Sequence, residues 1–169
     1  MWVFVGYIPF KIYLPQKKRD HNIYIFLCVI KHMANEAILR VETAPPINAT
    51  VMDTNAIEKG AILVLSDPLT VSGGTALGTG NIFGGIAAAE KIAKDGKTKM
   101  PVYMDGIFDL VTASGGAVTI GQIVTNSGAN LIRTATEAEI AAGKGIGKAL
   151  ETRAEESEAE RIQVFVGHM

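Results

Sequence analysis

The sequence is poor in the residues that build catalytic and metal sites. Its 169 residues include one cysteine, Cys28, and three histidines, His21, His32 and His168. A single cysteine excludes an internal disulfide framework and a zinc site made of cysteines alone. Two histidines lie within the first 32 residues and the third is next to the last residue, so we expect no Ser-His-acid arrangement and no His/Cys metal site. We therefore predict a protein that is not an enzyme, with no catalytic residue, metal or cofactor.

The sequence also lacks an excess of charge of either sign and a long hydrophobic run. It has 16 Lys and Arg against 17 Asp and Glu, for a formal net charge of −1. A general nucleic-acid binder needs a clustered basic surface that neutralises phosphates. The longest uninterrupted apolar run, residues 23–30, is much shorter than the roughly 20 residues that span a bilayer. We predict neither nucleic acid nor a membrane as a partner.

The composition changes abruptly at Met33. Residues 1–32 hold seven of the eleven aromatic residues, none of the 21 alanines and a formal charge of +4, whereas residues 33–169 hold 17 of the 18 glycines and a charge of −5. A secretory signal peptide is not favoured, because residues 17–19 place basic charge after the first apolar stretch and no alanine precedes Met33. We favour Met33 as the natural start, with an over-extended reading frame upstream. The alternative is an apolar, basic N-terminal arm that docks on a partner.

These observations divide the chain into three expected parts. Residues 1–32 are a doubtful upstream segment, residues 33–56 an extended N-terminal arm and residues 57–169 a β-rich domain. The arm is expected to be extended because it contains Pro45-Pro46, and a proline disfavours the helical conformation in the residue before it. No partner for the arm is apparent within the chain.

Short apolar runs separated by glycine-rich turns predict the strands of the β-rich domain. Gly84 and Gly85 lie inside one run, where a bulge or a close backbone approach is expected. Asp105-Gly106 lies between two runs and predicts a two-residue hairpin. The later strands are expected to follow one another as a meander. The predicted strands cover residues 61–65, 82–88, 100–104, 107–112, 118–124, 130–133, 145–150 and 162–166.

Three further segments complete the expected architecture. Thr136 followed by Glu139 is a capping-box pattern and Gly143 can end a helix, so a helix of about two turns is expected between them. Residues 66–81 are rich in Gly, Thr and Ser and predict a surface loop, and the acidic residues 151–160 predict a solvated connection. The predicted fold is all-β with one short helix, a compact β-barrel or β-sandwich with an extended N-terminal arm.

Several segments resemble the capsid-decoration, or head cement, proteins of tailed phages and related viruses. The resemblance covers residues 34–167 and is strongest over residues 83–91, 95–98, 102–110, 120–124 and 145–150. It implies a structural virion protein that is made in the host cytoplasm and binds the outer capsid surface as a homotrimer. There it would clamp adjacent major capsid protein subunits and stabilise the mature shell. By position, the resemblance assigns capsid contact to arm residues Glu36, Ile38, Leu39, Val41, Pro45 and Pro46.

Two other functions compete with this interpretation. The Gly/Thr-rich residues 72–81 suit a carbohydrate- or cell-surface-binding β module, although sugar sites usually present aromatic faces and the four aromatic residues after Met33 all lie in predicted strands. A small enzyme would need the acid pair Asp105 and Asp109. On the predicted hairpin, Asp105 supplies the turn and Asp109 faces solvent, so this function is not favoured.

Overall fold

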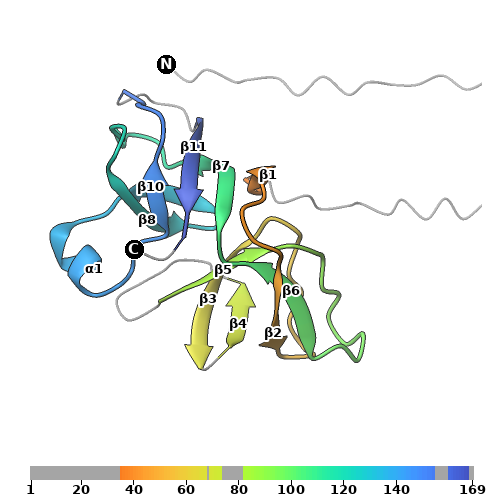
Figure 1. Cartoon of the computed structure of the whole chain (residues 1–169). Coiled ribbons are helices and arrows are strands. Elements are labelled where there is room, and N and C mark those ends of the chain that lie inside the picture. Colours follow the sequence, from red (N-terminus) through yellow and green to blue (C-terminus); the bar gives the residue numbers. More distant parts are fainter. Residues whose placement is uncertain (1–34, 68, 74–81, 155–159, 168–169) are drawn as a thin grey trace, which may run out of the picture. The chain divides into compact units, whose positions relative to one another are not determined.

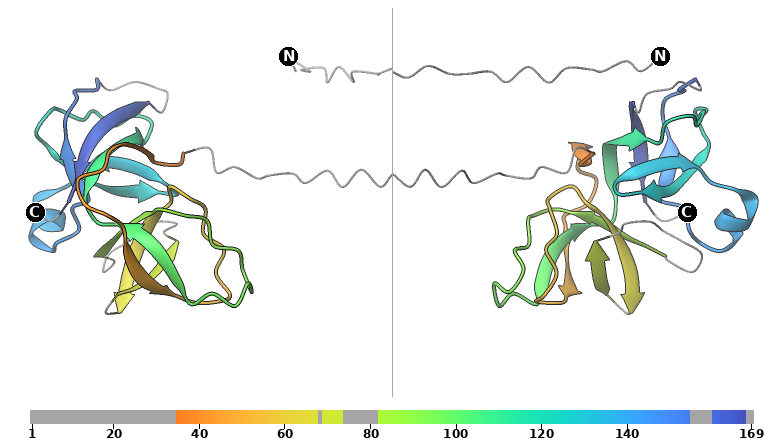
Figure 2. Two further views of the ribbon diagram at one scale, coloured as in Figure 1. Left: turned by 45° about the vertical axis from the view of Figure 1, so that its right-hand side comes forward. Right: turned by 180° about the vertical axis from the view of Figure 1, so that it is seen from behind.

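The described strands form two closed five-stranded barrels. The computed structural model describes residues 35–67, 69–73, 82–154 and 160–167 (Figures 1 and 2). The first barrel runs in the order β2-β4-β3-β5-β6, and the second in the order β7-β11-β10-β8-β9 with a β7–β9 pairing that closes it. The first contains β2 (Ile47–Val51), β3 (Ile62–Asp67), β4 (Thr70–Gly73), β5 (Ile82–Ala87) and β6 (Lys99–Tyr103). The second contains β7 (Gly106–Thr112), β8 (Ile123–Gly128), β9 (Leu131–Thr134), β10 (Gly147–Ala149) and β11 (Arg161–Val166).

Two further elements, a strand and a helix, lie beside the five strands of the second barrel. Strand β1 (Ile38–Val41) pairs antiparallel with β7, and helix α1 (Glu137–Ala141) lies between β9 and β10. The prediction of an all-β fold with one short helix is confirmed, and of the two architectures considered the barrel is the one formed. Residues 1–32, the doubtful upstream segment, lie outside the described residues.

The second barrel repeats the first, strand by strand. In each, the first strand pairs in parallel with the third and antiparallel with the fifth. The register is also repeated: Val51 pairs with Val71, and 61 residues later Thr112 pairs with Ile132. The hairpins β3–β4 and β8–β9 carry a register shift at equivalent places. The chain is therefore an internal duplication, which the sequence analysis did not detect.

Backbone details follow the same repeat. Leu69 and Asn130, at equivalent turns, both have positive φ, of 54° and 57°. Lys91 and Arg153 form equivalent isolated bridges with Ile57 and Val118, and both cations are buried. Conformations that are uncommon for residues other than glycine thus recur at the same place in each barrel, which supports a common origin of the two halves.

The segment expected to be an extended arm is in fact paired within the chain. Its strand β1 pairs with β7, and its strand β2 is part of the first barrel. The expectation that the arm has no partner in the chain was wrong. It failed because the partner strands lie far away in the sequence. A pattern of alternating apolar residues predicts a strand but does not indicate which other strand it pairs with.

The predicted hairpin at Asp105-Gly106 was also wrong. The two strands exist, but β6 pairs with β2 and β5, whereas β7 pairs with β11 on one edge and with β1 and β9 on the other. No edge is free for a β6–β7 pair. Asp105 and Gly106 instead carry the chain from the first barrel into the second.

Other strand predictions were right in part. Strands β3, β5, β9, β10 and β11 lie where they were expected, and Gly84 and Gly85 coincide with a register shift between β3 and β5. The predicted strand at residues 118–124 is wrong, because the structure has an isolated bridge at Val118 and a strand only from Ile123. The predicted meander is incomplete, since β7 pairs with β9 and not with β8. The predicted loop at 66–81 contains β4, and its residues 68 and 74–81 lie outside the described residues.

The short helix was predicted correctly. Thr136 is the N-cap and forms a capping box with Glu139. The Glu139 carboxylate also accepts hydrogen bonds from Arg133, at 2.5 and 3.0 Å. The hydrogen bond from Arg133, followed by that from the Thr136 backbone, lowers the pKa of Glu139 from 4.5 to about 2. This network fixes α1 against β9.

The lowered pKa of Glu139 predicts a stability difference that depends on pH. Because the folded-state pKa lies below the unfolded one, the charged carboxylate stabilises the fold above about pH 4.5, and this contribution is lost as the pH falls toward 2. Glu139→Gln should therefore lower the free energy of unfolding at pH 7 by about 1 kcal/mol, a value reduced for solvent screening. The difference should vanish near pH 2 in urea titrations. Glu137→Gln, in the same turn but exposed, is the control, and a difference that does not change with pH would contradict the prediction.

Candidate functional site

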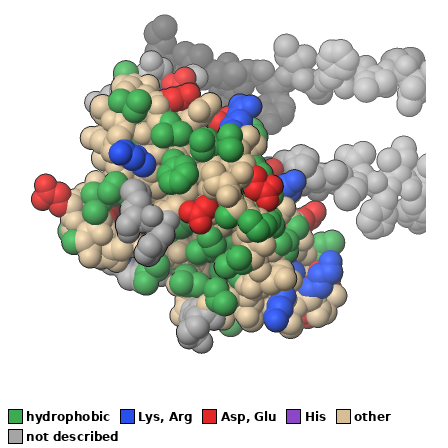
Figure 3. Space-filling model, viewed as in Figure 1, with side chains coloured by type: hydrophobic (Ala, Val, Ile, Leu, Met, Phe, Trp, Pro, Cys, Tyr) green, Lys and Arg blue, Asp and Glu red, His purple; other side chains and the backbone are tan. Residues whose placement is uncertain are grey.

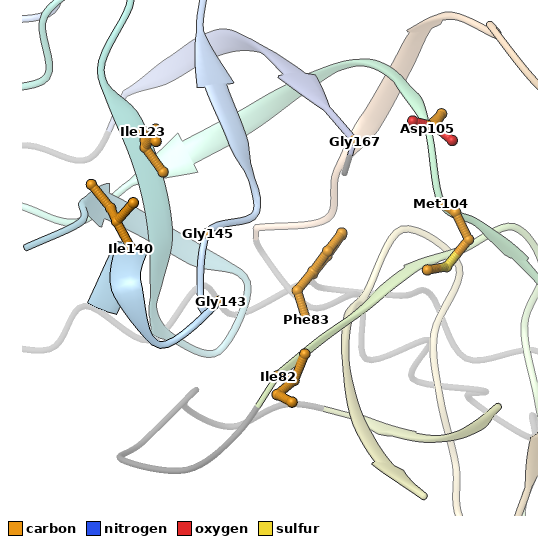
Figure 4. A pocket seen from close by; sticks show the side chains of 9 residues that line it. All are labelled: Ile82, Phe83, Met104, Asp105, Ile123, Ile140, Gly143, Gly145 and Gly167. Atoms are coloured by element: carbon orange, nitrogen blue, oxygen red, sulfur yellow. The ribbon is translucent and has the colours of Figure 1, made fainter. Parts of the chain in front are cut away.

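A cleft of about 310 Å³ opens between the two barrels. In Figure 4, Ile123 and Ile140 lie on one side, Met104 and Asp105 on the other, and Phe83 points into the space between them. Apart from the carboxylate of Asp105, the cleft is bordered by apolar side chains and glycine backbone. Its lining residues are Ile82, Phe83, Met104, Asp105, Ile123, Ile140, Gly143, Gly145 and Gly167.

Exposed apolar side chains surround the cleft. Ile82 is 48 % exposed and Ile140 is 41 % exposed, and Phe165 of β11 is 40 % exposed on the outer face of the second barrel. In the space-filling view, apolar side chains are spread over the surface with charged side chains among them (Figure 3). Exposed apolar side chains beside a cleft are typical of a site where another macromolecule binds. Among the described residues that line the cleft, Asp105 is the one with an ionisable side chain.

The arm residues expected at a capsid contact are in part exposed. Ile38 and Val41 of β1 are 44 % and 48 % exposed, and Pro45 and Pro46 are exposed in the connection that follows. Leu39 instead packs against the core cluster that contains Phe108 and residues of both barrels. The Glu36 backbone carbonyl accepts a hydrogen bond from the Arg161 side chain at 2.7 Å. The arm therefore combines residues that anchor it with residues that face outward.

Asp109 was predicted to face solvent, but its side chain is buried. Its side chain is 8 % exposed, and its carboxylate accepts hydrogen bonds from the Arg40 guanidinium, with the Nε donor at 2.7 Å. The hydrogen bond with Asp109 raises the pKa of Arg40. The prediction failed because β1 pairs with the edge of β7 and brings Arg40 against Asp109, and that pairing was not foreseen. Asp109 thus holds β1 in place, while Asp105 lines the cleft.

The two buried cations are structural. The Lys91 ammonium donates to Asp95 at 2.6 Å and to the backbone carbonyl of Ile92 at 2.7 Å, and these bonds close the loop after β5. Burial opposes the charge of Lys91, but the hydrogen bond and attraction to Asp95 outweigh it and raise the pKa of Lys91. Arg153 donates to the carbonyls of Ala113 and Gly116 at 3.2 and 3.0 Å.

Within the described residues, no three His, Cys, Asp or Glu side chains come together as a metal site would require. No helix among those residues is long and apolar enough to cross a membrane. The Gly/Thr-rich residues 72–81, which suggested carbohydrate binding, lie outside the described part of the chain except for Ser72 and Gly73.

The cleft was not predicted from the sequence, because its lining comes from both barrels and from α1. One indication was present in the alternation of residues 162–166. Phe165 falls on the side opposite Ile162, Val164 and Val166, which are buried. A large aromatic residue on the outward side of a strand is a feature of binding surfaces, and this residue lies beside the cleft.

The family of the chain is shown by its sequence. A family model described as phage cement protein matches residues 41–166, which span every strand from β2 to β11. Comparison with curated proteins gave no match. The matched region is three quarters of the chain and contains both barrels and the cleft. The chain therefore belongs to the phage cement protein family.

Proposed function

We propose that this protein binds the outer surface of an icosahedral phage capsid as a homotrimer and clamps adjacent major capsid protein subunits. The observation that carries the proposal is the family match over both barrels, since the phage cement family implies a capsid-associated structural role. Binding only to the mature lattice stabilises that lattice by mass action. Synthesis in the host cytoplasm, before assembly on the virion, is part of the same proposal.

The outer side of β1 supports a contact with the capsid. Among the described residues β1 pairs only through its β7 side, which leaves its other edge open to an extended segment of a capsid subunit. Backbone hydrogen bonds along such an edge give affinity, and the alternating side chains give specificity. Ile38 and Val41, both nearly half exposed, supply apolar contact beside that edge.

The test is decoration of capsids that lack the protein. The purified full chain is expected to sediment with expanded, undecorated capsids in a saturable way and to raise their temperature of disruption. A double variant Ile38→Glu and Val41→Glu should weaken binding by about tenfold or more, because charged groups would be desolvated at the contact. Ile92→Glu, which changes a residue that is 63 % exposed outside the arm, should bind normally. Absence of binding by the unaltered chain at every salt concentration would overturn the proposal.

A further inference from the structure

We propose that a second copy of this chain docks the open end of its first barrel onto the outer face of the second barrel, repeating the junction that joins the two barrels within one chain. The inference rests on the proposed self-assembly and names the two faces that produce it. It follows from the internal duplication, because two equivalent barrels carry equivalent faces and only one pair of these faces is joined within a chain.

The junction within the chain uses two different faces. The first barrel contributes outward-facing residues of β3, β5 and β6, and the second contributes its end, where β7 begins and β8 turns into β9. The rings of Tyr103 and Phe108 meet edge to face, with centroids 5.8 Å apart. The Ile62 backbone N–H donates to the Asn130 side-chain oxygen at 2.9 Å. The apolar residues of both sides share one core cluster, to which the first barrel gives Ile62, Val64, Phe83, Ile86 and the half-buried Tyr103.

Because the barrels are equivalent, each residue of the junction has an equivalent residue on the other barrel. Strands β10 and β11 of the second barrel are equivalent to β5 and β6 of the first. Ile86 pairs with Tyr103 in the first barrel, and Lys148 pairs with Phe165 at the equivalent place in the second. The β3–β5 and β8–β10 pairings put Ile123 at the position of Ile62. On the other side of the junction, Ile47 takes the place of Phe108.

Several residues of the unused faces are exposed although their equivalents at the junction are buried. Phe108 is 1 % exposed, whereas its equivalent, Ile47, is 42 % exposed. Asn130 is 1 % exposed, whereas its equivalent, Leu69, is 53 % exposed. On the outer face, the exposed Phe165 lies beside the cleft that Ile123 lines. Apolar side chains are thus buried where the junction exists and uncovered where it does not, which is the pattern expected when a second copy completes it.

The second junction would differ from the first in two contacts. Leu69 stands where Asn130 accepts the hydrogen bond of Ile62, so an apolar contact replaces that hydrogen bond. Lys148 stands where Ile86 packs, and its aliphatic stem can cover apolar surface while its ammonium stays in water. The lysine suits a contact between separate chains, because this face is in water before the chains associate.

The arrangement predicts a closed ring. A contact between two different faces is heterologous, and it closes when its rotation divides a full turn. The proposed homotrimer would then contain six equivalent barrels around one axis, with junctions within and between chains in alternation. The cleft would be filled by the neighbouring copy.

The test is the mass of the full chain by size-exclusion chromatography with light scattering. Phe165→Glu and Ile47→Lys are each expected to weaken self-association by about 30-fold or more, as loss of a central interface residue does. The double variant should recover most of this loss, because the two charges would face each other across the junction. The matched controls are Ile92→Glu and Ile120→Lys, which alter residues that are 63 % and 62 % exposed and are not among the junction residues named above.

A third variant tests whether assembly can be weakened without loss of the fold. Leu69→Gly removes the apolar side chain without adding a hydrogen-bond acceptor, and glycine suits the positive φ of 54° at this position, so it should weaken assembly while the circular dichroism spectrum and thermal midpoint are maintained. If all three single variants keep the mass of the unaltered chain, the assigned faces are wrong although self-assembly stands. If the unaltered chain is monomeric at every concentration, self-assembly itself fails, and the inference with it, while capsid binding is judged by the decoration experiment.

Discussion

Gly147→Ala is expected to lower the free energy of unfolding by at least about 3 kcal/mol, or to prevent folding. A Cβ atom at this position would lie 2.2 Å from the Phe165 carbonyl oxygen and 2.9 Å from the Val166 Cα. Both are backbone atoms of β11, so no side-chain rotation can relieve the overlap. Strand β10 would have to move, and it pairs with both β8 and β11. Urea titration followed by far-UV circular dichroism measures the loss.

Gly85→Ala should have a similar effect, because Gly85 is the equivalent position of the first barrel. A Cβ atom there would meet the Val102 side chain at 2.3 Å and the Tyr103 carbonyl oxygen at 2.7 Å, and the φ of +104° adds backbone strain. Gly116→Ala is the control, since its Cβ would meet its nearest neighbour at 3.7 Å and its cost should stay below about 1 kcal/mol. Equal stability of the Gly147 and Gly116 variants would contradict the packing of β10 against β11.

The elements that the sequence predicted are those whose determinants are local. The capping box of α1 needs only Thr136 and Glu139, three residues apart, and both form the expected bonds. The alternation of β11 and the close approach at Gly85 were also visible within a few residues. Each of these features depends on backbone geometry that neighbouring residues decide.

The elements that failed depend on which strands meet. Asp105-Gly106 has the composition of a hairpin turn, yet the edges of β6 and β7 are filled by strands from elsewhere in the chain. The duplication was missed because equivalent positions share size and polarity class more than identity: Lys91 corresponds to Arg153 and Ile57 to Val118. A barrel constrains which positions point inward and which turns need a positive φ, and many residues satisfy these constraints.

In the candidate site, too, local features could be predicted from the sequence and features that depend on distant contacts could not. The exposed residues Ile38, Val41, Pro45 and Pro46 were selected through the family resemblance, and their role at the capsid stays a prediction. The cleft needs Phe83 of the first barrel and Ile140 of α1, which no sequence pattern connects. A surface made by two barrels becomes visible only when their junction is known.

That junction should account for a large share of the stability. Phe108→Ala is expected to lower the free energy of unfolding by about 4 kcal/mol, the usual cost of removing a buried phenylalanine ring. Phe108 is 1 % exposed, belongs to the core cluster that joins the barrels and meets the ring of Tyr103 edge to face. Its loss would open a cavity at the end of the second barrel, against the outer face of the first.

Phe165→Ala is the matched control for this change, because it removes the same ring from a position that is 40 % exposed. It should cost less than about 1 kcal/mol in the isolated chain, measured by urea titration at a concentration where that chain is monomeric. At higher concentrations the unaltered chain should gain stability by mass action, and Phe165→Ala should reduce this gain. A Phe108 variant as stable as the Phe165 variant would show that the barrels stabilise each other little, and it would remove the physical basis for a second junction of the same kind.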